Sequence, residues 1–191
     1  MIDLIIPYYN NSEGLAQTLN SINREVFHVT VVDDNSLIYM PYNVDVDQVL
    51  RYNANRGPGF ARQFGLERTH EPYIMFLDTG DVFVSKEVQY RIEYELVNTK
   101  AVLASYLYYH YDELSKHTDN RLHGKIYKRA FLEEYGISFP LESSYLNEDV
   151  GFNRACKLII ENNKLLQTRT DLPVIRQTKD ENSLTQKDNQ D

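Results

Sequence analysis

Short apolar runs alternate with helical patterns through the first half of the chain, and this alternation most constrains the fold. Apolar runs at residues 4–6, 27–32, 49–52 and 73–77 predict strands. Between them, a helix that Asn11 or Ser12 can cap has apolar positions 15, 19 and 22, and a second helix begins at Pro58 and runs to about residue 69. This order predicts a single α/β domain with a Rossmann-like, mostly parallel central sheet flanked by helices.

The second half of the chain has a less regular pattern. We expect helices at residues 86–97 and 128–135, with Gly136 ending the latter, and strands at 101–111 and 172–175. Asn147 is positioned to cap a further helix with apolar positions 152, 155, 156, 159 and 160. Residues 186–191 are polar, and we expect a frayed tail there.

Polar segments follow three of the predicted strands directly. They are residues 7–10, 33–36 and 78–81, which read Pro-Tyr-Tyr-Asn, Asp-Asp-Asn-Ser and Asp-Thr-Gly-Asp. Right-handed crossovers bring the carboxyl ends of parallel strands to one edge of a sheet, where ligands bind in open α/β folds. We therefore expect these segments to form one site.

The composition excludes several classes of protein. With 28 acidic and 20 basic residues, the chain has a formal net charge of −8, and its basic residues are scattered, so it has no strong nucleic-acid signature. The single cysteine, Cys156, excludes an internal disulfide and a cysteine-cluster metal site. No apolar run reaches the roughly 18–20 residues of a transmembrane helix. We expect a soluble, intracellular protein of the cytoplasm.

The motifs, taken in order, resemble those of the family 2 glycosyltransferases, over nearly the whole length of the chain. The segments that carry the resemblance are Ile6-Pro7-Tyr8-Tyr9-Asn10, Val32-Asp33-Asp34-Asn35-Ser36, residues 55–65, residues 73–81, His123-Gly124-Lys125, residues 136–139 and residues 147–152. The resemblance implies a GT-A fold over residues 1–185, in which residues 1–100 bind the nucleotide and residues 101–185 contribute the acceptor and catalytic half. It also implies an enzyme that transfers sugar from a nucleotide sugar, typically with inversion.

The resemblance places a nucleotide pocket along the strand ends. The residues it implies are Pro7, Tyr9, Asn10, Asp33, Asp34, Asn55, Gly57, Arg62, Asp78 and Thr79. A carboxylate can accept the N–H of a pyrimidine ring or ribose hydroxyls, and either Asp33 or Asp34 suits that role. Arg62 can reach a phosphate, a uracil carbonyl or Asp78. Each residue also has an ordinary alternative as a turn former, a helix cap, a packing residue or a structural ion pair.

Asp78 and Asp81 are candidate metal ligands, and His123 is a further one, although a lone histidine more often has no such role. Mn²⁺ or Mg²⁺ prefers carboxylate and phosphate oxygens, and it neutralises the charge that develops on a leaving diphosphate. The family usually has an acid two residues after the first aspartate of its Asp-x-Asp motif. Here Gly80 occupies that position, which leaves Asp81 as the second carboxylate.

Glu148 and Asp149 form the candidate catalytic element. Inverting transfer requires a base that takes the proton of the acceptor hydroxyl, and the resemblance assigns this role to Asp149. Neighbouring helical residues point about 100° apart, so Glu148 is free to orient other groups or meet the acceptor. The simpler alternative is that both acids only stabilise the first turn of a helix.

The resemblance implies a nucleotide-sugar donor, which we expect to be a UDP-sugar, and it leaves the acceptor open among a glycan, a lipid-linked sugar, a protein and a modified nucleobase. Two other functions fit the same pattern. A sugar-phosphate nucleotidyltransferase also uses a nucleotide-binding α/β sheet, although a Gly-rich loop with arginine normally follows its first strand. A non-catalytic nucleotide-binding protein with the same fold is the other alternative, and Gly80 is the reason to consider it.

Overall fold

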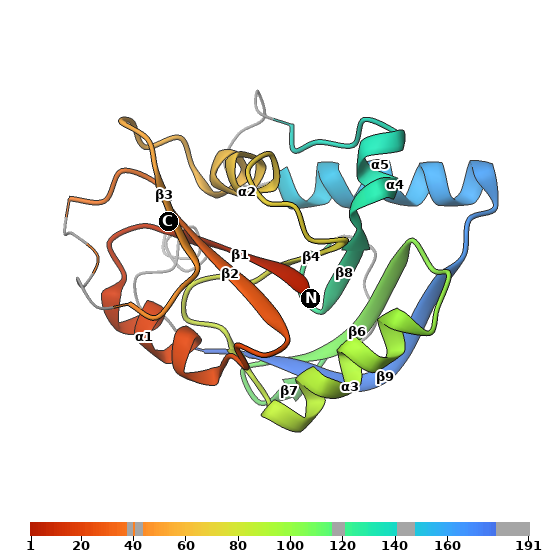
Figure 1. The fold of residues 1–191 in the computed structure, drawn as a ribbon, viewed down its shortest axis with the longest axis horizontal. Coiled ribbons are helices and arrows are strands. Elements are labelled where there is room, and N and C mark those ends of the chain that lie inside the picture. The colour runs from red at the N-terminus through yellow and green to blue at the C-terminus, as the bar shows by residue number, and fades with distance from the viewer. Residues whose placement is uncertain (38–39, 41–43, 116–120, 141–147, 179–191) are drawn as a thin grey trace, which may run out of the picture.

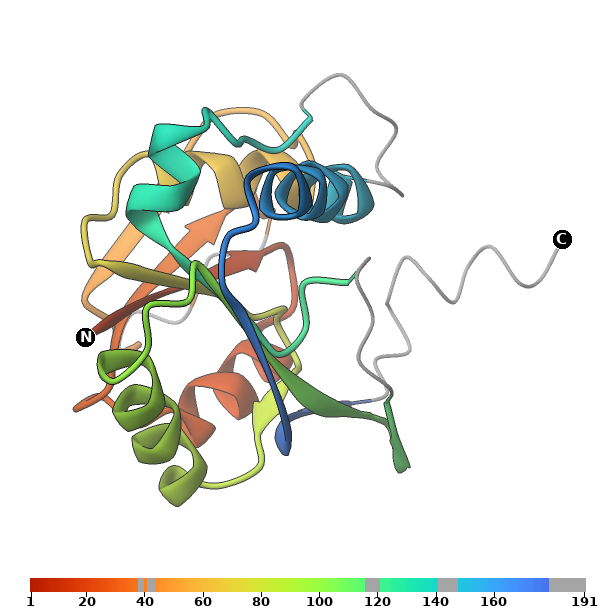
Figure 2. The ribbon, with the colours of Figure 1, turned by 90° about the vertical axis from the view of Figure 1, so that its right-hand side faces the viewer.

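A nine-stranded sheet forms the centre of the molecule, with strand order β3-β2-β1-β4-β8-β6-β9-β5 and β7 paired to β6. The structure is a computed structural model, and it describes residues 1–37, 40, 44–115, 121–140 and 148–178. Figures 1 and 2 show helices on both faces of this curved sheet. The expected α/β class is therefore confirmed.

The first four strands are parallel, as the alternating pattern predicts. They and the helices between them are β1 (Ile2–Tyr8), α1 (Ser12–Ser21), β2 (Phe27–Asp33), β3 (Gln48–Arg51), α2 (Pro58–Leu66) and β4 (Tyr73–Phe76). Asn11, rather than Ser12, caps α1, because its Oδ1 accepts a hydrogen bond of 2.8 Å from the amide of Gly14. Pro58 begins α2, where its missing N–H costs nothing.

Beyond β4 the sheet is mixed. The remaining elements are β5 (Val82–Phe83), α3 (Lys86–Val97), β6 (Leu103–His110), β7 (Glu113–Leu114), β8 (Lys125–Lys128), α4 (Arg129–Glu134), α5 (Glu148–Asn163) and β9 (Gln167–Gln177). β8 lies antiparallel between β4 and β6, and β9 runs parallel to β6 with a change of register between Tyr106 and Tyr108. The mostly parallel arrangement expected from the sequence thus describes the first half. Beyond β4, the described strands β5, β7 and β8 run in the opposite direction to the others.

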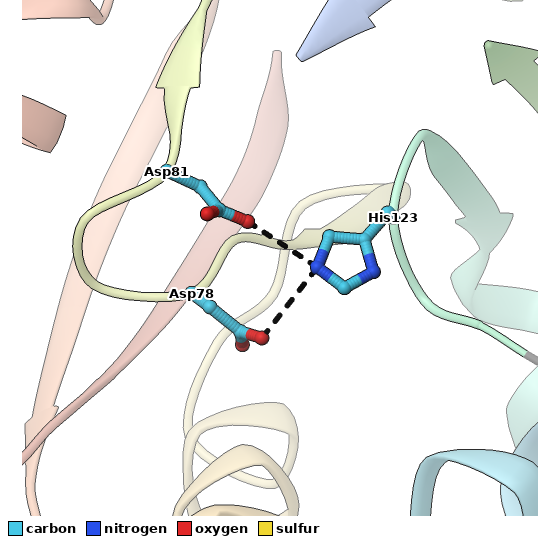
Figure 3. A group of neighbouring side chains, drawn as sticks. All are labelled: Asp78, Asp81 and His123. Atoms are coloured by element: carbon cyan, nitrogen blue, oxygen red, sulfur yellow. Dashed lines mark ion pairs between the residues drawn. The ribbon is translucent and has the colours of Figure 1, made fainter. Parts of the chain in front are cut away.

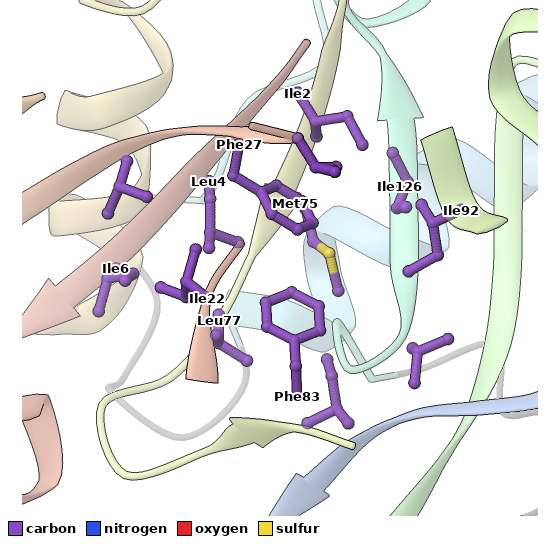
Figure 4. Packing of buried hydrophobic residues seen from close by; sticks show 14 of the residues in the cluster. Ile2, Leu4, Ile6, Ile22, Phe27, Met75, Leu77, Phe83, Ile92 and Ile126 are labelled. Carbon is purple, nitrogen blue, oxygen red and sulfur yellow. The ribbon is translucent and has the colours of Figure 1, made fainter. Parts of the chain in front are cut away.

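Two apolar clusters lie on opposite faces of the sheet because neighbouring strand residues point to opposite sides. On one face, Leu4 of β1, Met75 of β4 and Ile92 of α3 belong to a cluster in which the rings of Phe27 and Phe83 stack with centroids 5.0 Å apart (Figure 4). The other cluster includes Ile5 of β1 with residues of α2, α4 and α5. This packing fixes α2 and α5 on the same face, which decides where the candidate site forms.

Within the described residues, no helix combines the length and the apolar character that crossing a membrane requires. The predicted helix cap at Asn147 and the predicted tail at 186–191 lie outside the described residues.

Candidate active site at the carboxyl ends of the parallel strands

The three polar segments meet at one edge of the sheet. The hydroxyl of Thr79, after β4, donates a hydrogen bond of 2.6 Å to the carbonyl of Pro7 in β1. The amide of Asp34, after β2, donates one of 2.9 Å to the carbonyl of Tyr8. The ends of β1, β2 and β4 are therefore joined directly, as the strand order predicts.

Asp34 shapes the loop that leads into α2. It is 4% exposed, and its carboxylate accepts hydrogen bonds from the Tyr52 hydroxyl (2.8 Å), the Arg56 amide (2.6 Å) and the Gly57 amide (2.7 Å). Burial raises the pKa of Asp34, and these three hydrogen bonds oppose the rise. Gly57 has a φ of 85°, which favours glycine. Asn55 lies exposed in the same loop.

Asp33 forms the neighbouring part of the rim. It is buried, pairs with Arg51, and accepts a hydrogen bond of 2.8 Å from the amide of Ser36. The hydroxyl oxygen of Ser36 in turn accepts a hydrogen bond of 3.0 Å from the backbone amide of Asn10. Tyr9, next to Asn10, is 46% exposed at this edge, so its ring is accessible to a ligand.

Arg62 connects α2 to two other segments. Its side chain is buried, and it donates from Nη2 to Oδ1 of Asp78 at 2.6 Å and from Nη1 to Oε1 of Glu148 at 3.0 Å. Burial alone would raise the pKa of Asp78, but the Arg62 and His123 cations outweigh it and hold the pKa below its usual value. Of the partners expected for Arg62 from the sequence, Asp78 is present in the structure.

Asp78, Asp81 and His123 form a cluster suited to a divalent cation (Figure 3). Nε2 of His123 lies 3.3 Å from Oδ2 of Asp81 and 3.7 Å from Oδ2 of Asp78, and one ligand atom from each residue lies within 4.8 Å of the others. Gly80, at a φ of 102°, makes the turn between the two aspartates. Burial opposes protonation of His123, but Asp81 and Asp78 outweigh it and raise its pKa. The two carboxylates suit a hard divalent cation, and the imidazole adds a ligand typical of transition metals.

Two residues that hold His123 in place were not predicted from the sequence. The ring of Tyr108 stacks on His123 with centroids 5.0 Å apart, and Nε2 of Gln177 lies 2.8 Å from Nε2 of His123. Thr178, the next residue, donates a hydrogen bond of 2.6 Å to the carbonyl of Gly80. Tyr108 lies in β6, Gln177 ends β9 and Thr178 follows it, and no local motif marks these positions.

Glu148 and Asp149 begin α5 and occupy different surroundings. Glu148 is buried against Gly59 of α2, where a Cβ atom on Gly59 would lie 2.4 Å from Cγ of Glu148. Burial raises the pKa of Glu148, and the Arg62 cation opposes the rise. Asp149 is more exposed, and its negative charge contributes to the raised pKa of Arg62. Glu148 is therefore held by Arg62, while Asp149 lies beside the same cation and faces a more open environment.

A protein-family model described as glycosyl transferase family 2 matches residues 3–153 of the chain. An uncharacterized glycosyltransferase of Rickettsia bellii is 23% identical over 133 residues, which cover 62% of this chain and 18% of that protein. One from Haemophilus influenzae is 27% identical over 108 residues, covering 51% of this chain and 43% of that protein. The matched segment thus spans less than half the length of these relatives.

Solved structures share the fold. TarS residues 1–349 of S. aureus, in complex with UDP-GlcNAc, superimposes with a TM-score of 0.79 at 21% identity, covering 95% of this chain and 59% of that chain. The mannosyltransferase PcManGT of Pyrobaculum calidifontis, in complex with GDP-Man and Mn²⁺, gives a TM-score of 0.71 at 15% identity, covering 95% of this chain and 58% of that chain. These likenesses confirm the fold expected from the motifs.

Proposed function

The chain belongs to glycosyl transferase family 2, and we propose that it is an inverting enzyme that transfers a sugar from a UDP-sugar to an acceptor hydroxyl. The family membership supports a nucleotide-sugar donor. The choice of UDP follows the TarS structure, whose complex contains UDP-GlcNAc. In this proposal the first hundred residues bind the nucleotide, and the later elements supply His123 and the catalytic carboxylate.

The nucleotide pocket in this proposal is the rim that joins the strand ends. Tyr9 offers an exposed ring beside Pro7 for contact with the base, and Asn10 and Asp33 form the polar wall next to it. The loop at Asn55 and Gly57 closes the pocket on the α2 side. Because Asp34 already accepts three hydrogen bonds from its own surroundings, we assign it to shaping this wall.

Asp78, Asp81 and His123 would hold a divalent cation, Mn²⁺ or Mg²⁺, next to the donor diphosphate. A bound cation would neutralise the negative charge that develops on the leaving nucleoside diphosphate. Arg62 keeps the Asp78 carboxylate ionised and fixes its direction, which prepares the cluster for a cation. Gly80 in place of an acid is compatible with this role, because the turn at Gly80 brings Asp81 back toward His123.

Asp149 is the proposed base that accepts the proton of the acceptor hydroxyl as its oxygen attacks the anomeric carbon. Glu148 is the proposed positioning residue: its pair with Arg62 fixes the start of α5 relative to Asp78. This bridge from Asp78 through Arg62 to Glu148 is the observation that supports the proposal most, because it links the candidate metal cluster to the residue that precedes the candidate base.

The proposal is tested by turnover. Purified protein with Mn²⁺ and a panel of nucleotide sugars is expected to release nucleoside diphosphate from at least one UDP-sugar, and Asp149→Asn is expected to lower the rate by about 10²–10⁴-fold. Asp45→Asn is the matched control, because Asp45 is exposed and the substitution keeps its backbone carbonyl, which accepts a hydrogen bond from Arg24. Full activity of Asp149→Asn would reject the base assignment.

The same assay separates the two other functions. Release of pyrophosphate from a nucleoside triphosphate would indicate a nucleotidyltransferase. Nucleotide binding that is indifferent to Mn²⁺, with no turnover of any donor, would indicate a non-catalytic binding protein.

A further inference from the structure

A second hollow lies away from the candidate active site, between α5 and the strands β8 and β9. Its volume is about 80 Å³, and its polar lining includes Lys125 of β8, Arg169 of β9, and Asn153, Lys157 and Glu161 of α5. A cavity of about 10–15 Å³ is enough for one water molecule, so this hollow admits a larger polar group. None of its lining residues belongs to the nucleotide pocket or the metal cluster.

The charge around this hollow is opposite to that of the chain. The chain as a whole has a net charge of −8, yet three basic side chains and one acidic side chain line the hollow. Lys125, at its floor, is 4% exposed and donates from Nζ to the carbonyl of Arg121 at 2.6 Å and to Oδ1 of Asn153 at 3.1 Å. Lys157 and Arg169 also line the hollow, and Nζ of Lys157 lies 4.0 Å from Oε1 of Glu161. Three cations to one carboxylate suit a group with several acceptor oxygens and negative charge.

The hollow lies on the same face of α5 as the proposed base. Asp149, Asn153 and Lys157 follow at intervals of four residues, which places them one above the other on a helix. Nδ2 of Asn153 donates a hydrogen bond of 2.9 Å to the carbonyl of Asp149, so the floor of the hollow is connected to the base through Asn153. Eight residues at 1.5 Å each separate Asp149 from Lys157 by about 12 Å along the helix.

We propose that this hollow binds a phosphate group carried by the acceptor whose hydroxyl Asp149 deprotonates, with Lys157 two helical turns beyond Asp149 on α5. The proposal rests on the proposed function and adds the chemical class of the acceptor, a phosphorylated glycan or lipid-linked sugar phosphate. The positive hollow holds the phosphate, and the shared helix face aligns the rest of the acceptor with the base. The acceptor is thereby selected by its charge as well as by its hydroxyl.

Binding is tested without turnover, by titrating inorganic phosphate into ¹⁵N-labelled protein and following the amide resonances. The amides of Asn153, Lys157 and Arg169 are expected to shift in the native protein. The double variant Lys157→Gln/Arg169→Gln is expected to bind phosphate at least 10-fold more weakly. Lys86→Gln/Arg91→Gln is the matched control, because it removes the same charge from exposed positions on α3 and should bind as the native protein does. Unchanged affinity in the Lys157/Arg169 variant, or no shifts around the hollow, would overturn the proposal.

A second measurement identifies the source of the phosphate. With the donor found in the turnover assay, kcat/KM is compared for a disaccharide acceptor and its 1-phosphate. A preference of at least 10-fold for the phosphorylated acceptor, lost in the Lys157/Arg169 variant while donor hydrolysis without acceptor is unchanged, supports the proposal. Equal kcat/KM for both acceptors, with phosphate binding intact, would assign the hollow to free phosphate and reject the proposal of a phosphorylated acceptor.

The two proposals fail in different ways. Phosphate shifts around the hollow in a protein that turns over no nucleotide sugar would reject the proposed function. Turnover of a UDP-sugar by a protein whose hollow ignores phosphate would reject only the acceptor site.

Discussion

Removing the charge of Arg62 is expected to destabilise the fold strongly. In Arg62→Met, the aliphatic part of the side chain is largely retained, but Glu148, whose side chain is 10% exposed, loses its cation. Breaking a buried ion pair by removing one partner costs about 3–5 kcal/mol. Asp78 is 41% exposed, so solvent screens its half of the interaction and we assign most of the loss to Glu148.

Equilibrium unfolding in urea measures this loss. With a slope of about 2 kcal/mol/M, a loss of about 3–4 kcal/mol lowers the midpoint by about 1.5–2 M. Arg91→Met is the control, because the pair of Arg91 with Glu95 lies on the surface, with the arginine 59% exposed, and such pairs contribute only about 0.3–0.5 kcal/mol. The double variant Arg62→Met/Glu148→Met is expected to recover much of the loss, since an apolar pair replaces a buried charge.

The loss of unfolding free energy in Arg62→Met should also depend on pH. Burial already raises the pKa of Glu148 above its ordinary value, and without Arg62 only a backbone hydrogen bond opposes that rise, so the folded-state pKa lies further above the unfolded one. A carboxyl shifted in that direction favours the folded state below its unfolded pKa and loses this contribution as the pH rises. The difference between Arg62→Met and the native protein should therefore shrink from pH 7 to pH 5. A loss below about 1 kcal/mol, equal to that of Arg91→Met and constant with pH, would refute the reasoning.

Two further predictions concern the packing of α5. In Gly59→Ala the new Cβ would lie 2.4 Å from Cγ of Glu148, so Glu148 should be displaced. This variant should lose about 1–3 kcal/mol of unfolding free energy in urea and turn over more slowly. Gly136→Ala is the control: its Cβ would meet nothing within 4 Å, so it should lose only about 1–2 kcal/mol for its positive φ and keep its turnover. Burial raises the pKa of the Cys156 thiol to about 12, so native Cys156 should resist iodoacetamide at pH 8 and react in urea. The thiol of the unfolded chain ionises at lower pH than the native thiol, so the free energy of unfolding should fall above about pH 9. Cys156→Ala should lack the part of this fall that Cys156 causes. Rapid labelling of the native protein by iodoacetamide would contradict the burial of Cys156.

The parallel half of the fold could be predicted because its signals are local. β1, β2 and β4 are apolar runs that end at polar segments, Asn11 caps α1, and Pro58 begins α2. The right-handed crossover rule then predicts that these polar segments meet at one edge of the sheet, without knowledge of any specific contact between distant residues. The second half depends on pairings between distant residues. β8 is four residues long with a lysine at each end, so neither length nor apolar character marks it as a central strand.

The candidate site shows the same division. Asp78 and Asp81 follow a strong strand and stand out in the sequence, whereas His123 gains meaning only when β8 places it 3.3 Å from Asp81. The pair of Arg62 with Glu148 joins residues 86 positions apart, and only the packing of α2 and α5 on one sheet face creates it. Gln177 was missed because it lies at the end of β9, where register shifts decide which residues reach the site.

The central claim, that Asp78, Asp81 and His123 hold a cation beside the nucleotide diphosphate, is tested most directly by anomalous diffraction from crystals grown with UDP and Mn²⁺. We expect one manganese peak within about 2.0–2.3 Å of a ligand atom from Asp81 and of a ligand atom from either His123 or Asp78. Diphosphate oxygens of UDP should lie on the side of the ion that faces away from these residues. Ordered UDP with no manganese among these three side chains, or manganese bound elsewhere on the chain, would contradict the account.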